Sequence, residues 1–173
     1  MIIFVVGYMG SGKSTFGKRL ANHLGYGFID LDHLFEETYR IDIAGFFSKY
    51  GETVFRKMEH ELLEKNLSHR EMVVSCGGGT PCFFDNMQIM NENGVTVYLQ
   101  LTPATLAQRL AQARKKRPLI ETLPGGDLEQ KIMLHLAGRE HFYLQAQLVV
   151  DGISVDLSKT AEIIKQLISG YGV

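Results

Sequence analysis

A glycine-rich octapeptide with a lysine at its seventh position lies close to the N-terminus. It reads Gly-Tyr-Met-Gly-Ser-Gly-Lys-Ser at residues 7–14, directly after an apolar run at 2–6 that has the length of a buried strand. This spacing of glycines, lysine and hydroxyl is typical of a phosphate-binding loop. Backbone N–H groups in such a loop turn inward around phosphate oxygens, and the helix that follows adds positive potential. The sequence therefore predicts a nucleotide-binding loop followed by a helix that begins at Lys13.

The side chains of this loop have distinct predicted roles. Lys13 should reach the β- and γ-phosphate oxygens, and the hydroxyl of Ser14 should coordinate magnesium. The predicted nucleotide-binding residues of the loop are Gly10, Ser11, Gly12, Lys13, Ser14 and Thr15.

Short runs rich in β-branched residues alternate with helical patterns along the rest of the chain. The runs lie at 2–6, 72–74, 95–101 and 148–150, with a weaker one at 28–29. Strands that are buried on both faces have this composition, and helices between strands connect parallel neighbours. The 173 residues suit one domain. We expect a single α/β domain over residues 1–173, with helices covering a parallel sheet.

Composition and charge argue against several classes of protein. The 18 Lys and Arg residues against 19 Asp and Glu residues give a net charge of −1, which provides no field for nucleic acid or an anionic membrane. No stretch has the length of a membrane span, and no basic leader precedes the first strand. Cys76 and Cys82 lack paired spacing, which argues against a disulfide or zinc site. We expect a cytoplasmic protein without nucleic-acid or membrane partners.

Two carboxylates, Asp30 and Asp32, follow the weak apolar run at 28–29. Near a phosphate loop, one carboxylate can hold magnesium through water while the other orients an acceptor hydroxyl for in-line attack. Either aspartate could instead cap the following helix, because aspartate is favoured at helix N-termini. Asp151, at the end of the run 148–150, is the alternative to Asp30 as the acidic partner of the metal.

Arg56 and Glu59 are one helical turn apart, beside an apolar stripe formed by Phe55, Met58 and Leu62. The fork of an arginine matches a planar carboxylate, and Glu59 could hold the guanidinium in place. Spacing alone favours a plainer interpretation, a solvated ion pair worth roughly a few tenths of a kcal/mol.

Three consecutive glycines at 77–79 follow the run at 72–74 and Ser75-Cys76. Glycines remove side chains from a strand end where the backbone must approach another group closely. An ordinary flexible turn is the alternative.

Two arginines in the C-terminal half are candidates for anion binding. Arg139 continues an apolar helical stripe that runs from Leu128 to Tyr143, where it either meets an anionic partner or extends its charge from the edge of the core. Arg117 lies in a charged segment at 113–127 whose prolines and glycines predict a mobile loop. There it could stabilise charge developing on the γ-phosphate, or belong to a solvated basic run.

Taken in order, these motifs resemble the shikimate kinase family. The matching residues are Gly-x-x-Gly-Ser-Gly-Lys-Ser-Thr at 7–15, Asp-x-Asp at 30–32, Phe-Arg at 55–56 with Glu59, Gly-Gly-Gly at 77–79, Arg-Pro-Leu at 117–119 and Arg139 before Tyr143. The resemblance covers nearly the whole chain. It implies a three-layer α/β/α fold of the nucleoside-monophosphate-kinase type, with a five-stranded parallel sheet in order 2-3-1-4-5. It also implies a lid at about 113–127 and acceptor-binding helices at about 32–67.

The resemblance further implies that the protein transfers the γ-phosphoryl group of ATP to the 3-hydroxyl of shikimate, with Mg²⁺ as cofactor. This reaction belongs to aromatic amino-acid biosynthesis, and we expect the enzyme to be a monomer. Asp32 would be the base or orienting group, Lys13 and Arg117 would act on the phosphates, and Ser14 with Asp30, through water, would hold Mg²⁺. Arg109 would contact ATP, whereas the segment 151–155 does not reproduce the family's adenine contacts clearly. The implied shikimate-binding residues are Asp32, Arg56, Gly77, Gly78, Gly79 and Arg139, with Glu59 in support.

Other functions share parts of this pattern. A gluconate kinase would have the same loop and fold, and gluconate is also a hydroxylated carboxylate. A nucleotide kinase would need a pocket for a second base, which no residue pattern marks. A guanine-specific switch should carry Asn-Lys-x-Asp, which is absent, and a non-catalytic ATP-binding module should have lost Lys13 or Asp32, which are both present.

Overall fold

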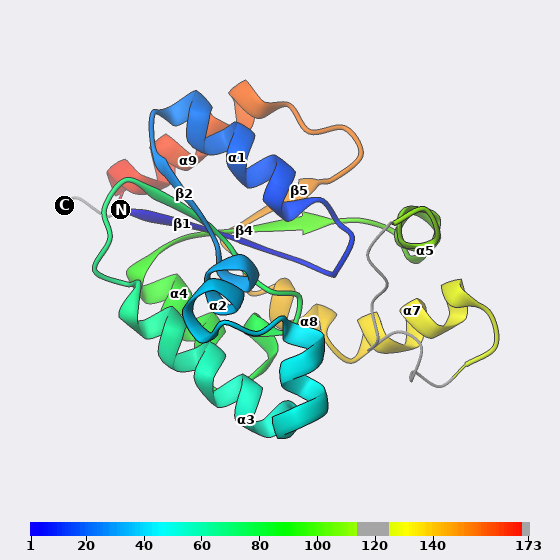
Figure 1. The fold of residues 1–173 in the computed structure, drawn as a ribbon. Coiled ribbons are helices and arrows are strands. Elements are labelled where there is room, and N and C mark those ends of the chain that lie inside the picture. The colour runs from blue at the N-terminus through cyan, green and yellow to red at the C-terminus, as the bar shows by residue number, and fades with distance from the viewer. Residues whose placement is uncertain (114–124, 171–173) are drawn as a thin grey trace.

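The computed structural model describes residues 1–113 and 125–170. At its centre lies a parallel sheet with the strand order β2-β3-β1-β4-β5 (Figure 1). The expected strand order and three-layer α/β/α fold are confirmed. The strands are β1 (Ile2–Val6), β2 (Gly27–Asp30), β3 (Met72–Ser75), β4 (Gly94–Gln100) and β5 (Leu148–Asp151).

The residues of β1 alternate between two hydrophobic cores, one on each face of the sheet. Ile3 and Val5 pack into the core beneath α1 (Lys13–Leu24) and α9 (Leu157–Gly170). Ile2, Phe4 and Val6 pack into the core on the opposite face. This period of two is what a strand buried on both sides requires.

The second core lies under a larger group of helices (Figure 1). The helix α5 (Pro103–Ala111) leads away from the carboxyl end of β4, and α7 (Leu128–Ala137) lies beside it. The remaining elements on this side are α2 (Leu31–Tyr39), α3 (Ile43–Lys65), η1 (Thr80–Cys82), α4 (Asn86–Asn93) and α8 (Glu140–Tyr143).

Three details of this helical layer were not predicted from the sequence. The stripe from Leu128 to Tyr143 is not one helix, because α7 ends at Ala137 and Arg139 precedes the separate helix α8. The helix α3 breaks at Gly51, whose backbone has φ 79° and ψ 168°. The helix α4 had no clear sequence signal, because few of its residues are buried.

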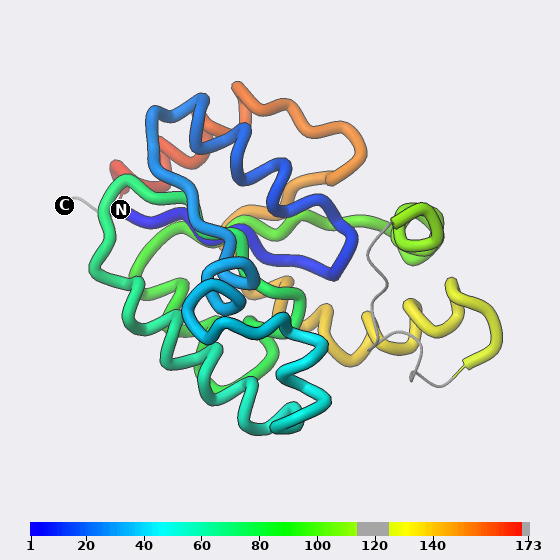
Figure 2. The backbone as a smooth tube through the Cα atoms, in the orientation of Figure 1, coloured from blue at the N-terminus to red at the C-terminus, as the bar shows by residue number. Residues whose placement is uncertain are grey.

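The strand ends position the loops that carry the candidate site. Because all strands are parallel, the loops after β1, β2, β3 and β4 leave the sheet at the same end, as the backbone trace in Figure 2 shows. Such carboxyl ends are where ligands gather in open α/β sheets. Among the described helices, none is long and apolar enough to cross a membrane.

Candidate active site

A cavity of about 640 Å³ opens at the carboxyl ends of the strands. It brings together residues from the phosphate loop, α2, α3, the glycine segment 77–79, α5 and the start of α8. Ser11 is a buried residue of the phosphate loop and does not line the cavity. Arg117 lies outside the described residues. The predicted site residues that line the cavity are Gly10, Gly12, Lys13, Ser14, Thr15, Asp30, Asp32, Arg56, Glu59, Gly77, Gly78, Gly79, Arg109 and Arg139.

The phosphate loop wraps tightly from β1 into α1. Gly10 and Gly12 have φ values of +80° and +95°, which side chains other than glycine rarely adopt. The helix α1 begins at Lys13, as expected. The ammonium group of Lys13 donates to the carbonyl of Tyr8 over 2.9 Å, and the residue as a whole is 8% exposed. The loop therefore places a largely desolvated cation and a helix N-terminus together at the cavity.

Ser14 and Asp30 lie side by side beneath this loop. The hydroxyl of Ser14 donates to the carboxylate of Asp30, and the hydroxyl of Ser75 lies 3.4 Å from that of Ser14. Asp30 also caps α2, because its other oxygen accepts from the N–H of His33 over 3.2 Å. The interpretation of Asp30 as a helix cap is therefore confirmed, and its role toward magnesium stays a prediction. Asp151 instead accepts from the residues of its own turn and does not line the cavity.

The residues Ser14 and Asp30 have the chemistry of a magnesium site. Mg²⁺ prefers oxygen ligands and is usually held by one or two protein groups together with phosphates and water. Within the described part of the chain, no cluster of three or more His, Cys, Asp or Glu side chains could hold a metal. A hydroxyl and a carboxylate beside a phosphate loop fit a metal that is bound mainly through the nucleotide.

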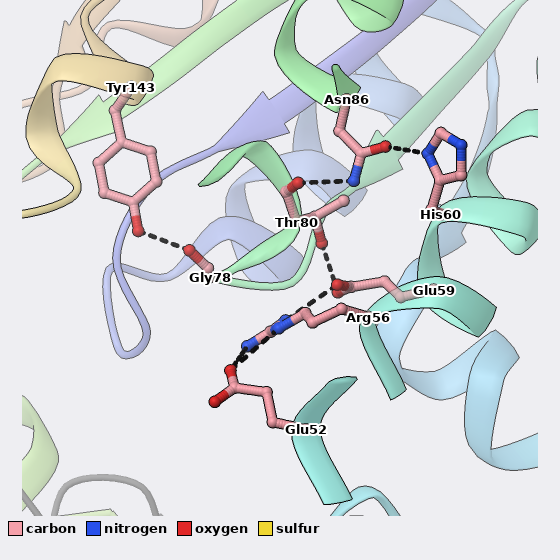
Figure 3. Close-up of polar contacts among 8 residues, drawn as sticks. All are labelled: Glu52, Arg56, Glu59, His60, Gly78, Thr80, Asn86 and Tyr143. Atoms are coloured by element: carbon pink, nitrogen blue, oxygen red, sulfur yellow. Dashed lines mark hydrogen bonds and ion pairs between the residues drawn. The ribbon is translucent and has the colours of Figure 1, made fainter. Parts of the chain in front are cut away.

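Arg56 is buried between two carboxylates of α3. Its Nη1 donates to Glu59 over 2.9 Å, and its Nε and Nη2 donate to Glu52 over 3.1 and 3.0 Å (Figure 3). Arg56 is 5% exposed and Glu59 is 3% exposed, so the interpretation as a solvated pair is wrong. Burial opposes the charge on Arg56, but Glu59 and Glu52 outweigh it and raise the pKa of the guanidinium. The result is a fixed, permanently charged group in the cavity wall.

The glycines at 77–79 let functional side chains pack directly on the backbone. A β-carbon at Gly79 would lie 2.5 Å from the guanidinium carbon of Arg56. One at Gly77 would lie 2.6 Å from Asp32 and 2.8 Å from Glu59. Real β-carbons essentially never come this close, so this turn brings its backbone against functional side chains, as the close-approach interpretation expects. Asp32, in the first turn of α2, and Arg56 thus meet the same backbone segment.

The wall opposite α3 is formed around Arg139. This residue lies at the N-terminus of α8 and lines the cavity. The hydroxyl of Tyr143, in the same helix, donates to the carbonyl of Gly78 over 2.5 Å (Figure 3). Burial raises the pKa of Tyr143 well above its usual value, so the side chain stays a neutral donor. Tyr143 therefore ties α8, and Arg139 with it, to the glycine segment.

A hydrogen bond between Tyr8 and His135 was not expected from the sequence. The two side chains are 127 positions apart, and the Tyr8 hydroxyl lies 2.7 Å from Nδ1 of His135. Burial and the charge of Arg139 lower the pKa of His135 to about 4, so its ring is neutral near neutral pH. Burial also raises the pKa of Tyr8 to about 12, so both partners of this hydrogen bond are neutral. This contact links the phosphate loop to α7.

Arg109 joins the phosphate loop to the segment after β5. Its Nη1 donates to the carbonyl of Ser11 over 2.8 Å, and its Nη2 lies 3.4 Å from the carbonyl of Gly152. The structure thus places Arg109 beside the phosphate loop. A contact with ATP requires this position.

Comparisons with known proteins identify the relatives of this chain. Residues 9–170 match the family model described as shikimate kinase. A shikimate kinase of Parabacteroides distasonis is 41% identical over 149 residues, which cover 86% of each chain. The structure of a shikimate kinase from Acinetobacter baumannii in complex with shikimate has a TM-score of 0.84 and 32% identity, covering 98% of this chain and 93% of that one. A gluconokinase from Sinorhizobium meliloti has a TM-score of 0.58 and 19% identity over 97% of this chain and 95% of that one, a likeness of fold alone.

Proposed function

Because the chain belongs to the shikimate kinase family, we propose a specific division of roles among the residues of its cavity. The enzyme transfers the γ-phosphoryl group of ATP to the 3-hydroxyl of shikimate, a step of aromatic amino-acid biosynthesis. One observation carries the proposal. Lys13 of the phosphate loop, Asp32 and the buried guanidinium of Arg56 line a single cavity.

Arg56 and Arg139 bind the carboxylate of shikimate. Shikimate carries one carboxylate, and a guanidinium that is held rigidly by Glu59 and Glu52 can accept it without a large loss of side-chain entropy. Holding the ring at one end fixes the distance from its hydroxyls to the phosphates at the other end, which is how positioning accelerates a reaction between two substrates. Backbone groups of the glycine segment 77–79 complete this pocket.

Asp32 and Lys13 act on the reacting atoms. Asp32 accepts the hydrogen bond of the 3-hydroxyl and orients its oxygen toward the γ-phosphorus. As that oxygen forms its bond, the bond from the γ-phosphorus to the bridging oxygen of ADP breaks, and the hydroxyl proton passes to the Asp32 carboxylate. Lys13 faces the β- and γ-phosphate oxygens, where negative charge develops.

Ser14 and Asp30 are the residues that would hold Mg²⁺, Asp30 through water. The bound ion would neutralise charge on the β- and γ-phosphates. The adjacent hydroxyl and carboxylate support this assignment. Several other features stay predictions: contacts of Arg109 with ATP, a lid at about 113–127 that carries Arg117, and acceptor-binding helices at about 32–67. A monomeric state and a cytoplasmic location also stay predictions. Residues 114–124 lie outside the described part of the chain.

Substituting Arg56 by alanine tests the acceptor side. We expect the KM for shikimate to rise by roughly two orders of magnitude, since hydrogen bonds to a charged group are lost, while the KM for ATP changes by less than about threefold. Steady-state kinetics with each substrate varied in turn measure both values. Arg70→Ala, which removes an exposed arginine, is the control. An unchanged KM for shikimate in the folded Arg56→Ala variant would contradict the proposed carboxylate site.

A further inference from the structure

Thr80 directly follows the glycines and is fully buried. Its hydroxyl donates to Oε1 of Glu59 over 2.6 Å, and its backbone carbonyl accepts from the side-chain amide of Asn86 over 2.8 Å (Figure 3). Of these two partners, Glu59 has a supporting role in the proposed shikimate site, and Asn86 has no proposed role there. Thr80 therefore connects the glycine segment to α3 and to α4 at once.

The contact between Thr80 and Asn86 fixes the orientation of the Asn86 side-chain amide. Through this amide, Thr80 has a second connection to α3, at His60. The carbonyl of Thr80 can only accept, so the NH₂ group of Asn86 faces it and the amide oxygen faces His60. That oxygen lies 2.6 Å from Nδ1 of His60, so this ring nitrogen carries the proton. Two successive residues of α3, Glu59 and His60, thus hold the segment that begins at Thr80, one directly and one through Asn86.

Glu59 uses its two oxygens for different partners. Oε2 accepts from Arg56, and Oε1 accepts from Thr80. The carboxylate is taken almost wholly out of water, so losing either donor would leave a buried charged oxygen without that partner. The Thr80 hydroxyl therefore restrains the carboxylate that holds Arg56 in place.

The surroundings of Glu59 make this donor important for its charge. Burial raises the pKa of Glu59, while Arg56 and the Thr80 hydroxyl lower it. Asp32, on α2, also faces Glu59 and raises its pKa. The thiols of Cys76 and Cys82 are also near enough for Glu59 to raise their pKa. Burial prevails, so the pKa of Glu59 is raised overall, and the cation Arg56 and the neutral donor Thr80 are the groups that counteract this rise.

We propose that Thr80 is a positioning residue for shikimate. Its hydroxyl fixes Glu59, and Glu59 fixes the guanidinium of Arg56 against the backbone of Gly79, where the carboxylate of shikimate must be received. A β-carbon at Gly79 would meet this guanidinium at 2.5 Å, so Arg56 lies directly against the backbone of the glycine segment. The inference rests on the proposed role of Arg56 in binding the acceptor.

Three substitutions of Thr80 separate its hydroxyl from its shape. Thr80→Val keeps the branched shape without the hydroxyl, Thr80→Ala removes both, and Thr80→Ser keeps the hydroxyl. We expect the valine and alanine variants to raise the KM for shikimate roughly tenfold, with kcat changed by less than about threefold, because a hydrogen bond to a charged group is lost. The serine variant should keep the wild-type KM within about twofold.

The pH profile of kcat/KM for shikimate provides a second readout. Without the Thr80 hydroxyl the pKa of Glu59 rises, so its charge is lost at a higher pH as the solution is acidified. The acidic limb should therefore move to higher pH in the valine and alanine variants and stay in place in the serine variant. Thr160→Val is the matched control, because Thr160 is also buried and its hydroxyl donates to the carbonyl of Asp156, just before α9.

The outcomes distinguish this inference from the role of Arg56. Wild-type KM and pH profile in folded Thr80→Val or Thr80→Ala would overturn the inference alone, provided that Arg56→Ala raises the KM for shikimate. A serine variant as impaired as the other two would also overturn it, because the shape and not the hydroxyl would then matter. An Arg56→Ala variant with unchanged KM would instead overturn the proposed carboxylate site itself.

Discussion

Replacing Asp32 by asparagine is expected to lower kcat by about three orders of magnitude while the KM for ATP stays within about twofold. Asparagine has nearly the same shape, so the close packing of residue 32 against Gly77 is retained. It carries no charge and cannot take the proton of the acceptor hydroxyl. The substitution should therefore act on the chemical step and leave the phosphate loop intact.

Rates of ADP release under saturating ATP and shikimate measure this effect. Asp85→Asn is a suitable control, because Asp85 is exposed, precedes α4 and makes no side-chain capping bond there. An Asp32→Asn enzyme that kept more than about a tenth of the wild-type kcat would exclude Asp32 as the group that accepts the proton.

Replacing Lys13 by alanine is expected to lower kcat by roughly 10²- to 10³-fold, the range found when a preorganised donor to a developing charge is removed. Lys13 is 8% exposed and is aimed by its hydrogen bond to Tyr8, so its charge acts in a largely dry environment. The γ-phosphoryl oxygens gain negative charge as transfer proceeds, and the loss should therefore fall mainly on the chemical step.

Single-turnover kinetics combined with calorimetric titration of ATP separate binding from chemistry in this variant. The exposed Lys159 in α9 provides the control Lys159→Ala. If Lys13→Ala bound ATP much more weakly but turned over normally at saturation, Lys13 would be a binding group only.

The sequence predicted the elements whose signals are local. The spacing of residues 7–14 requires a loop with positive φ values at its glycines, and Gly10 and Gly12 adopt them. The same motif predicts a helix that begins at Lys13, where α1 begins. Such features depend only on neighbours in the chain.

The parts that the sequence could not predict depend on packing between distant segments. The spacing of Arg56 and Glu59 is the same in a solvated pair and in a buried one, and only the packing of α3 against η1 and the glycine segment decides between them. The contact of Thr80 with Glu59 joins residues 21 positions apart, so no short motif marks it. The position of Arg139 depends on the end of α7, which a continuous apolar stripe conceals.

Comparison of acceptors tests the whole account most directly. ADP formation from MgATP should be measured with shikimate, with gluconate, with AMP and without an acceptor, at matched concentrations. We predict strong stimulation by shikimate and background rates with the other three. Stimulation by gluconate or AMP with no response to shikimate would leave the fold intact and contradict the roles of Arg56 and Arg139. Equal turnover without any acceptor would contradict kinase activity altogether.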